Sequence, residues 1–422
     1  MGTAFAVLVA AFTALGAPVF LAIGALALYA FHSAAIDPSL IMAELYRLAS
    51  LPALIAVPLF TYSGYVLAES RAPKRLLNLA GALFGWLPGG LAVATLVSCA
   101  VFTAFTGASG VTIIALGGLL YPMLLEQRYS ERFSLGLLTT TGSLGLLFPP
   151  SLPIILYGLI AKVSIDRLFL AGLIPGLLLI LILSAYALLR QREARAATVP
   201  FSGRALGRAA REAAWEIPLP FIIIGGIYGG IFTATEAAAI MAFYVTAVEF
   251  WVLRDLEFFR DFSGITVKSM VLVGAILMVM GMALGLTNYL IDEQIPMKLF
   301  GWVHRYVQDR TLFLILLNVF LLVMNMVEMF SAIVIVVPLV VPVAMQYGID
   351  PVHLGIIFLL NLEIGYMTAP FGLNLFLSAV RFEKPLTQVY RAALPFWLIL
   401  IGALIAVTYV PGLSLWLLGR AG

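Results

Sequence analysis

Long apolar runs recur along the chain, about 14 to 25 residues each, and they can cross or enter a bilayer as helices. This feature restricts the fold more than any other. Apolar residues make up 63% of the 422 residues and charged residues 11%, whereas charged residues make up about 25% of an ordinary soluble domain. The runs are continuous, not alternating as in a β-barrel. We therefore predict an all-α polytopic membrane protein.

The same composition argues against several classes of function. The single cysteine, Cys99, has no partner for a disulfide in its own chain, and the three histidines are not at metal-ligand spacing. No nucleophile–base motif and no nucleotide-binding loop occurs. We therefore expect no enzyme, no transition-metal site, no organic cofactor and no nucleic-acid partner. Transport would have to use an ion gradient.

One polar interval, residues 190–216, lies near the midpoint of the chain and carries six arginines against three glutamates. The positive-inside rule places such a segment in the cytoplasm. We take residues 191–216 as a linker between two halves, 1–190 and 217–422.

The two halves share a weak internal repeat. At an offset of 220 residues, three special backbone residues coincide: Pro122 with Pro342, Gly145 with Gly365, and Pro150 with Pro370. Ser130 and Asp350 coincide as well, and both residue types are good helix N-caps. Basic residues flank equivalent segments on opposite sides, which predicts inverted-topology repeats as in secondary transporters.

Each half is expected to contain a re-entrant hairpin (about 89–125 and 311–345) and a broken helix (about 131–163 and 351–380). Backbone groups at membrane depth are tolerated only where protein or a cavity satisfies them. Carbonyl oxygens freed at such breaks can bind a cation, and helix N-terminal amides can bind an anion. The plain alternative is that these Gly, Pro, Ser and Thr residues serve helix packing.

Outside these zones, membrane helices are expected near 3–16, 18–32, 51–69, 167–190, 217–232, 236–253, 268–290 and 393–418. Residues 38–50 and 256–267 are amphipathic and could lie along the interface. Three carboxylates need an explanation. Glu328 is either functional or a helix N-cap. Glu236 is expected to cap a helix. Glu363 and Asn361 are either functional or interhelical hydrogen-bonding residues.

Several motifs together resemble a known family. They are FTGASG (105–110) within the stretch FTAFTGASGVT (102–112), TTGSLGLLFPPSLP (140–153), GIFTATEAAA (230–239) and LEIGYMTAPFGLN (362–374). The chain resembles the large membrane subunit of tripartite ATP-independent periplasmic (TRAP) transporters over essentially its whole length. The resemblance implies an elevator-type carrier of the ion transporter superfamily in the bacterial inner membrane. The expected helices, with the arginine-rich linker in the cytoplasm, would place both termini in the periplasm. It implies sodium-coupled import of a small organic anion, a carboxylate or sugar acid. It also implies two partners, a small four-helix membrane subunit and a periplasmic substrate-binding protein.

The resemblance also implies site residues, with sodium as the coupling ion. The first sodium site would involve Thr106, Gly107, Ser109, Gly142, Ser143, Gly145 and Pro149. The second would involve Glu328, Met329, Gly365, Met367 and Thr368. The substrate would lie between them, near Ser109, Pro150, Ser151, Ser331 and Asn374.

Two alternatives stay open at this point. A stand-alone ion-coupled carboxylate carrier of the same superfamily would need neither a binding protein nor a small subunit. A non-transport membrane protein, an intramembrane enzyme or a scaffold, would show no ion dependence.

Overall fold

The structure, a computed structural model, describes residues 5, 7–9, 11, 12, 17–34, 36–194, 200–324, 329–369 and 372–419. Within these ranges all regular secondary structure is helical. Six of the helices are individually long and apolar enough to cross a membrane, and there are up to nine spans if each bent helix pair counts as one. The predicted all-α polytopic membrane fold is therefore confirmed.

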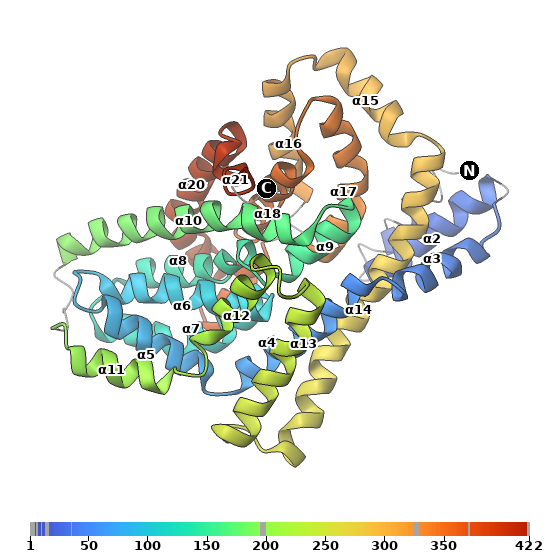
Figure 1. Cartoon of the computed structure of the whole chain (residues 1–422). Coiled ribbons are helices and arrows are strands. Elements are labelled where there is room, and N and C mark those ends of the chain that lie inside the picture. The colour runs from blue at the N-terminus through green and yellow to red at the C-terminus, as the bar shows by residue number, and fades with distance from the viewer. Residues whose placement is uncertain are drawn as a thin grey trace.

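One group of helices packs around the long helix α14 (Figure 1). It comprises α2 (Val19–Ser33), α3 (Ser39–Ala49), η1 (Pro52–Ile55), α4 (Ala56–Glu69), α12 (Pro218–Tyr228), α13 (Ala234–Ala247), a π-helical turn η3 (Val248–Val252) and α14 (Phe258–Asp292). Helices α2, α3 and α4 each contact α14, and α13 packs on α4. Thr233 and Glu236 form a reciprocal capping box at the start of α13, so the expected capping role of Glu236 is confirmed.

Two helix boundaries differ from the prediction. The expected interfacial piece at 256–267 is the beginning of α14, which continues unbroken to Asp292 because no proline interrupts its hydrogen-bond ladder. The helix expected at 393–418 is α20 (Leu386–Tyr409) followed by a short α21 (Gly412–Leu415), with Pro411 at the break. The helix expected near 3–16 lies largely outside the described residues.

A second group carries the helix breaks. It comprises α6 (Gly90–Thr106), α7 (Ser109–Glu126), α8 (Glu131–Thr141), η2 (Leu144–Leu147), α9 (Leu152–Ala161), α10 (Ile165–Ala194), α16 (Arg310–Met324), α17 (Met329–Gln346), α18 (Pro351–Gly365), α19 (Leu373–Arg381) and α20. The two halves of the chain exchange contacts in this group. Helix α9 packs on α17 while α19 packs on α7, and α8 packs on α20 while α18 packs on α10.

Helix starts in the two halves keep the spacing of the sequence repeat. Helices α6 and α16 start at 90 and 310, and α8 and α18 start at 131 and 351, so each pair is 220 residues apart. Helix α7 starts at 109, and the described part of α17 begins at 329. Ser130 caps α8 by accepting from the Phe133 amide at 3.3 Å, and Asp350 caps α18 by accepting from the Val352 amide at 2.7 Å. Both caps are as predicted. Helix α8 ends at Thr141, which corresponds to position 361, whereas α18 continues to Gly365.

A buried cluster of charged residues joins α5, the end of the polar linker and the segment around η3. Arg75 lies on α5 (Ala72–Phe84), the helix that links α4 to α6. Its Nε donates to Glu216 at 2.6 Å, its Nη2 donates to Glu249 at 2.9 Å, and its Nη1 donates to Asp255. Burial acts to lower the pKa of Arg75, but the bonds to Glu216 and Asp255 and the charge of Glu249 outweigh burial and raise it. The guanidinium therefore stays charged and ties the end of the polar linker to α5 and η3.

Candidate functional site

The tip of the first hairpin is a two-residue break, Gly107–Ala108, between α6 and α7. Gly107 has a left-handed φ of +64°, and a Cβ at this position would meet the Leu152 side chain at 2.7 Å. Only glycine satisfies both conditions without strain. The tip is therefore seated against the start of α9, and Thr106, Gly107 and Ser109 are all buried.

The first broken helix approaches the hairpin main chain closely. A Cβ on Gly145 would lie 2.3 Å from the Ala100 carbonyl oxygen and 2.4 Å from the Ala104 nitrogen. Thr103 Oγ1 donates to the Gly142 carbonyl at 3.0 Å and lies 2.6 Å from Thr112 Oγ1. The hairpin and the broken helix are thus joined by direct backbone contact and by one buried hydroxyl bridge.

The residues predicted for the first sodium site are gathered at this junction. A Cβ on Gly142 would lie 3.3 Å from the Ser109 carbonyl oxygen, which places the broken helix beside the hairpin tip. Ser143 is buried, and Pro149 is joined to Pro150 by a cis peptide bond in the turn before α9. These residues supply hydroxyl and carbonyl oxygens, the hard ligands that suit a small cation.

Asn374 crosses from the second half into this junction. Its Nδ2 donates to the Thr139 carbonyl at 3.2 Å and to Ser143 Oγ at 3.4 Å. Its Oδ1 is buried and has no hydrogen-bond partner among the described residues, and the same holds for Ser151 Oγ. Two residues predicted to bind substrate therefore keep unused polar atoms in a buried region.

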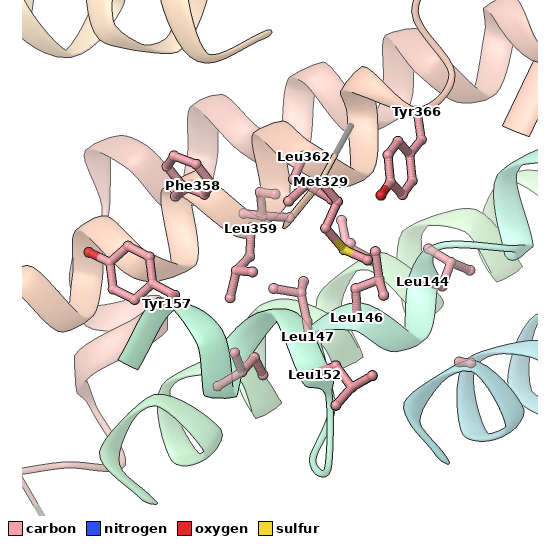
Figure 2. Close-up of a cluster of buried hydrophobic side chains, with 14 of the residues drawn as sticks. Leu144, Leu146, Leu147, Leu152, Tyr157, Met329, Phe358, Leu359, Leu362 and Tyr366 are labelled. Atoms are coloured by element: carbon pink, nitrogen blue, oxygen red, sulfur yellow. The ribbon is translucent and has the colours of Figure 1, made fainter. Parts of the chain in front are cut away.

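The second junction is described only in part, because Glu328 lies outside the described residues. Met329 is the first described residue of α17, and Figure 2 shows its side chain between Leu362 of α18 and Leu146 of η2. Its side chain belongs to an apolar cluster, so only the main chain of Met329 remains available as a ligand. Gly365 and Met367 are also buried.

Thr368, the last residue predicted for the second site, is held by two hydrogen bonds. Its Oγ1 donates to the Ile364 carbonyl at 2.8 Å and accepts from Trp397 Nε1 of α20 at 2.9 Å. Trp397 could not be selected from the sequence, because the contact joins α20 to the turn after α18, 29 positions away.

Three of the predicted substrate residues share one structural position, at or within the first turn of a helix that starts at a break: Ser109 in α7, Ser151 as the N-cap of α9 and Asn374 in α19. Ser331 lies near the beginning of the described part of α17. Helices α7 and α19 are in contact, since a Cβ on Gly110 would lie 2.8 Å from the Leu377 side chain. Helix N-termini carry partial positive charge and free amide donors, so this arrangement suits an anion.

Sequence reasoning also missed the buried Thr103 and the half-buried Asn318, and it misjudged Glu363. Thr103 lies one turn before Gly107, and this spacing is the signal that could have found it. Asn318 of α16 accepts from Asn361 Nδ2 at 2.7 Å, which confirms Asn361 as an interhelical hydrogen-bonding residue. The same expectation for Glu363 is wrong, because within the described residues both of its buried carboxyl oxygens have no partner.

A cavity of about 950 Å³ lies between the two groups of helices. Its walls come from the loop after α9, the start of α13, the C-terminal part of α14 and the middle of α17, with Arg47, Lys162, Asp166 and Glu236 among the charged lining residues. None of the predicted sodium or substrate residues that the structure describes lines it. The buried polar atoms without partners at the first junction, Ser151 Oγ and Asn374 Oδ1, lie outside this cavity.

Comparisons with known proteins agree on one family. Residues 6–413 match the family model described as the tripartite ATP-independent periplasmic transporter, DctM component. The chain is 38% identical over 364 residues to the C4-dicarboxylate TRAP transporter large permease protein DctM of Pseudomonas aeruginosa, covering 86% of this chain and 85% of that protein. It is 34% identical to the isethionate TRAP transporter permease protein DctMQ of Oleidesulfovibrio alaskensis, covering 97% of this chain and 65% of that protein.

Among solved structures, the crystal structure of the Alcanivorax borkumensis YdaH transporter is similar in fold, with a TM-score of 0.63 at 16% sequence identity. The match covers 88% of this chain and 87% of the YdaH chain. At this identity the likeness concerns the fold alone. The family model spans nearly all of the sequence, and the motifs that carried the resemblance lie within it. The chain therefore belongs to the family of large permease subunits, the DctM component, of tripartite ATP-independent periplasmic transporters.

Proposed function

We propose that this chain imports a small organic anion, a carboxylate or sugar acid, together with sodium ions. Two relatives are named for C4-dicarboxylates and for isethionate, and both are small organic anions. In this proposal a periplasmic substrate-binding protein delivers the anion, and a small four-helix membrane subunit completes the assembly. The relative named DctMQ is longer than this chain, which is compatible with a second subunit fused to it.

The observation that carries the proposal is the set of three helix N-termini at the breaks. They bring Ser109, Ser151 and Asn374 to the first turns of α7, α9 and α19. No lysine or arginine is among the residues assigned to the site. An anion would therefore be held by backbone amides, hydroxyl groups and helix dipoles. No ion pair with a basic side chain would have to break when the anion is released.

Sodium would bind on either side of the anion. Thr106, Ser109 and Ser143 offer buried oxygens at the first junction, and Gly142 lies beside the Ser109 carbonyl oxygen. Gly365 and Thr368 would serve the second junction, with Glu328 and the main chain of Met329. Bound sodium would contribute the positive charge that the protein itself does not place near the anion.

Transport would follow an elevator mechanism. The helices with the breaks, α6–α9 and α16–α19, would move as a unit against the group around α14. The equal 220-residue spacing of helix starts and the exchanged contacts between halves support inverted repeats, which allow two related states. The linker at 191–216 would be cytoplasmic and both termini periplasmic, in the bacterial inner membrane.

A thermal-shift experiment tests the sodium part without knowledge of the substrate. A ligand that binds only the folded state stabilises it by RT ln(1 + [L]/Kd). The melting temperature of the purified chain should therefore rise saturably in sodium chloride relative to choline chloride at equal ionic strength. A flat response, both for the chain alone and for the complex with its small subunit, would reject sodium coupling.

Uptake into proteoliposomes then tests the transport part. With the small subunit and the binding protein present, a C4-dicarboxylate or another small carboxylate should enter only when an inward sodium gradient is imposed. Equal uptake by the chain alone would favour the stand-alone carrier instead. Failure of every anion tested, with sodium stabilisation retained, would reject the substrate class but not the cation sites.

A further inference from the structure

The helix within the polar linker, α11 (Gly203–Glu212), has two unlike sides. Arg204, Arg208 and Arg211 are three and four residues apart, so they share one side of the helix. All three are exposed. The opposite side is apolar, with Ala209 buried, and it packs on α5 at the edge of the molecule (Figure 1).

None of these three arginines forms an ion pair within the part of the chain that the structure describes. Glu216, Glu249 and Asp255 all bind Arg75, so the acidic residue left beside the three arginines on α11 is the exposed Glu212. The arginine side of α11 is therefore a surface of net positive charge, with three arginines to one glutamate on the helix. Guanidinium groups match the geometry of phosphate oxygens and bind them in a bidentate manner.

The surroundings of α11 place this surface at the level of a membrane interface. Phe201 precedes the helix and is 58% exposed, and Trp215 follows it and is 41% exposed. The Trp215 ring lies 6.4 Å from the ring of Tyr244 in α13, a helix apolar enough to cross the membrane. Aromatic side chains of this kind concentrate at the headgroup level of bilayers.

We propose that the arginine side of α11, formed by Arg204, Arg208 and Arg211, binds the phosphate groups of anionic phospholipids. Helix α11 then lies in the interface plane, with its apolar side on α5 and its arginines among the headgroups. The charge selects anionic over zwitterionic lipids, and the flanking aromatics favour a lipid surface over a soluble acidic partner. Because α5 connects the group around α14 to the first hairpin, lipid binding would stabilise the connection on which that hairpin depends.

The test measures lipid binding by the purified full chain in detergent. Native mass spectrometry would count retained lipids as dioleoylphosphatidylglycerol or dioleoylphosphatidylcholine is added. The test variant is R204Q/R208Q/R211Q. The matched control is K298Q/R305Q/R310Q, which removes the same charge from three exposed positions on α15 (Ile295–Tyr306) and the start of α16.

Each basic side chain at an anionic surface contributes about fivefold in affinity, so loss of three should weaken phosphatidylglycerol binding on the order of 100-fold. The control variant should bind as the wild type does, and phosphatidylcholine should bind all three proteins equally weakly. Added choline chloride should release phosphatidylglycerol from the wild type by screening, a result that needs no variant to fold.

Three results would overturn the proposal. One is equal phosphatidylglycerol binding by the test variant and the wild type. Another is equal loss of binding in the test and control variants, which would indicate net charge and not the α11 surface. The third is competition by millimolar inorganic phosphate, which would identify a site for a free anion instead of a lipid headgroup.

Discussion

Thr103 and Gly142 join the first hairpin to the first broken helix, through a hydrogen bond of 3.0 Å from the threonine hydroxyl to the glycine carbonyl. Both residues are buried, and 39 positions separate them in sequence. The bond holds the carbonyl at the end of α8 beside the tip of the hairpin. The geometry of the first proposed sodium site therefore depends on a residue that does not belong to that site.

Replacing Thr103 with valine should leave the Gly142 carbonyl without its donor in a buried position. The expected cost is about 1–3 kcal/mol of folding free energy, together with a weaker stabilisation by sodium. Thermal unfolding in sodium and choline chloride measures both effects. Thr103→Ser keeps the hydroxyl and should behave almost as the wild type, whereas identical behaviour of Thr103→Val would contradict the role given to this bond.

Gly145→Ala should separate the broken helix from the hairpin. A methyl group here would lie 2.3 Å from the Ala100 carbonyl oxygen, so the main chain must move, and overpacking of this kind costs about 1–3 kcal/mol. The matched control is Gly81→Ala in α5, where a Cβ meets nothing within 4 Å. That change should stabilise the helix by about 0.5–1 kcal/mol, and melting temperatures of the two variants should therefore move in opposite directions.

Arg75→Gln should be strongly destabilising, because it leaves Glu216, Glu249 and Asp255 without their shared partner. Breaking a buried ion pair from one side costs about 3–5 kcal/mol. Arg71→Gln is the control, since the Arg71 side chain is 80% exposed and lies 4.0 Å from Asp255. Adding Glu249→Gln to Arg75→Gln should recover part of the loss in a thermal-unfolding measurement, and no recovery would show that charge is not the cause.

Glu363→Met should preserve or raise stability. The Glu363 side chain is fully buried and its carboxyl oxygens have no partner among the described residues, and an apolar residue of similar volume avoids the cost of burying them. Asn361→Leu, two residues away, should destabilise because it removes the bonds to Asn318 and to the Ile357 carbonyl. A large loss of stability in Glu363→Met would mean that the carboxyl binds a cation or another group.

The substitution Asn374→Asp tests the contact of Asn374, in the second half of the chain, with Thr139 and Ser143 in the first half. The amide Nδ2 donates to the Thr139 carbonyl and to Ser143 Oγ, and a carboxylate at this position would face the carbonyl with an acceptor and a negative charge. We expect transport of a small carboxylate to fall at least tenfold, with a smaller loss for Asn374→Ser. Proteoliposome uptake measures both, and unchanged uptake by Asn374→Asp would exclude this residue from the substrate region.

Local patterns were sufficient to predict most helix ends. The apolar runs, the caps at Ser130 and Asp350, and the Gly and Pro breaks are encoded within a few residues of where they act. The helix boundary expected at residue 267 was wrong because the local pattern was considered alone. Residues 256–267 are amphipathic, but no residue in the segment ends a helix, and the segment forms the beginning of α14.

The sequence by itself determined that the chain is a helical membrane protein of two related halves, because hydrophobic run length and breaking residues are local properties. Only the tertiary structure decided which groups meet at the junctions. Thr103 with Gly142, Asn374 with Ser143 and Trp397 with Thr368 each join different elements of the fold. These pairings depend on how the helices pack around the breaks, which one-dimensional periodicity does not encode.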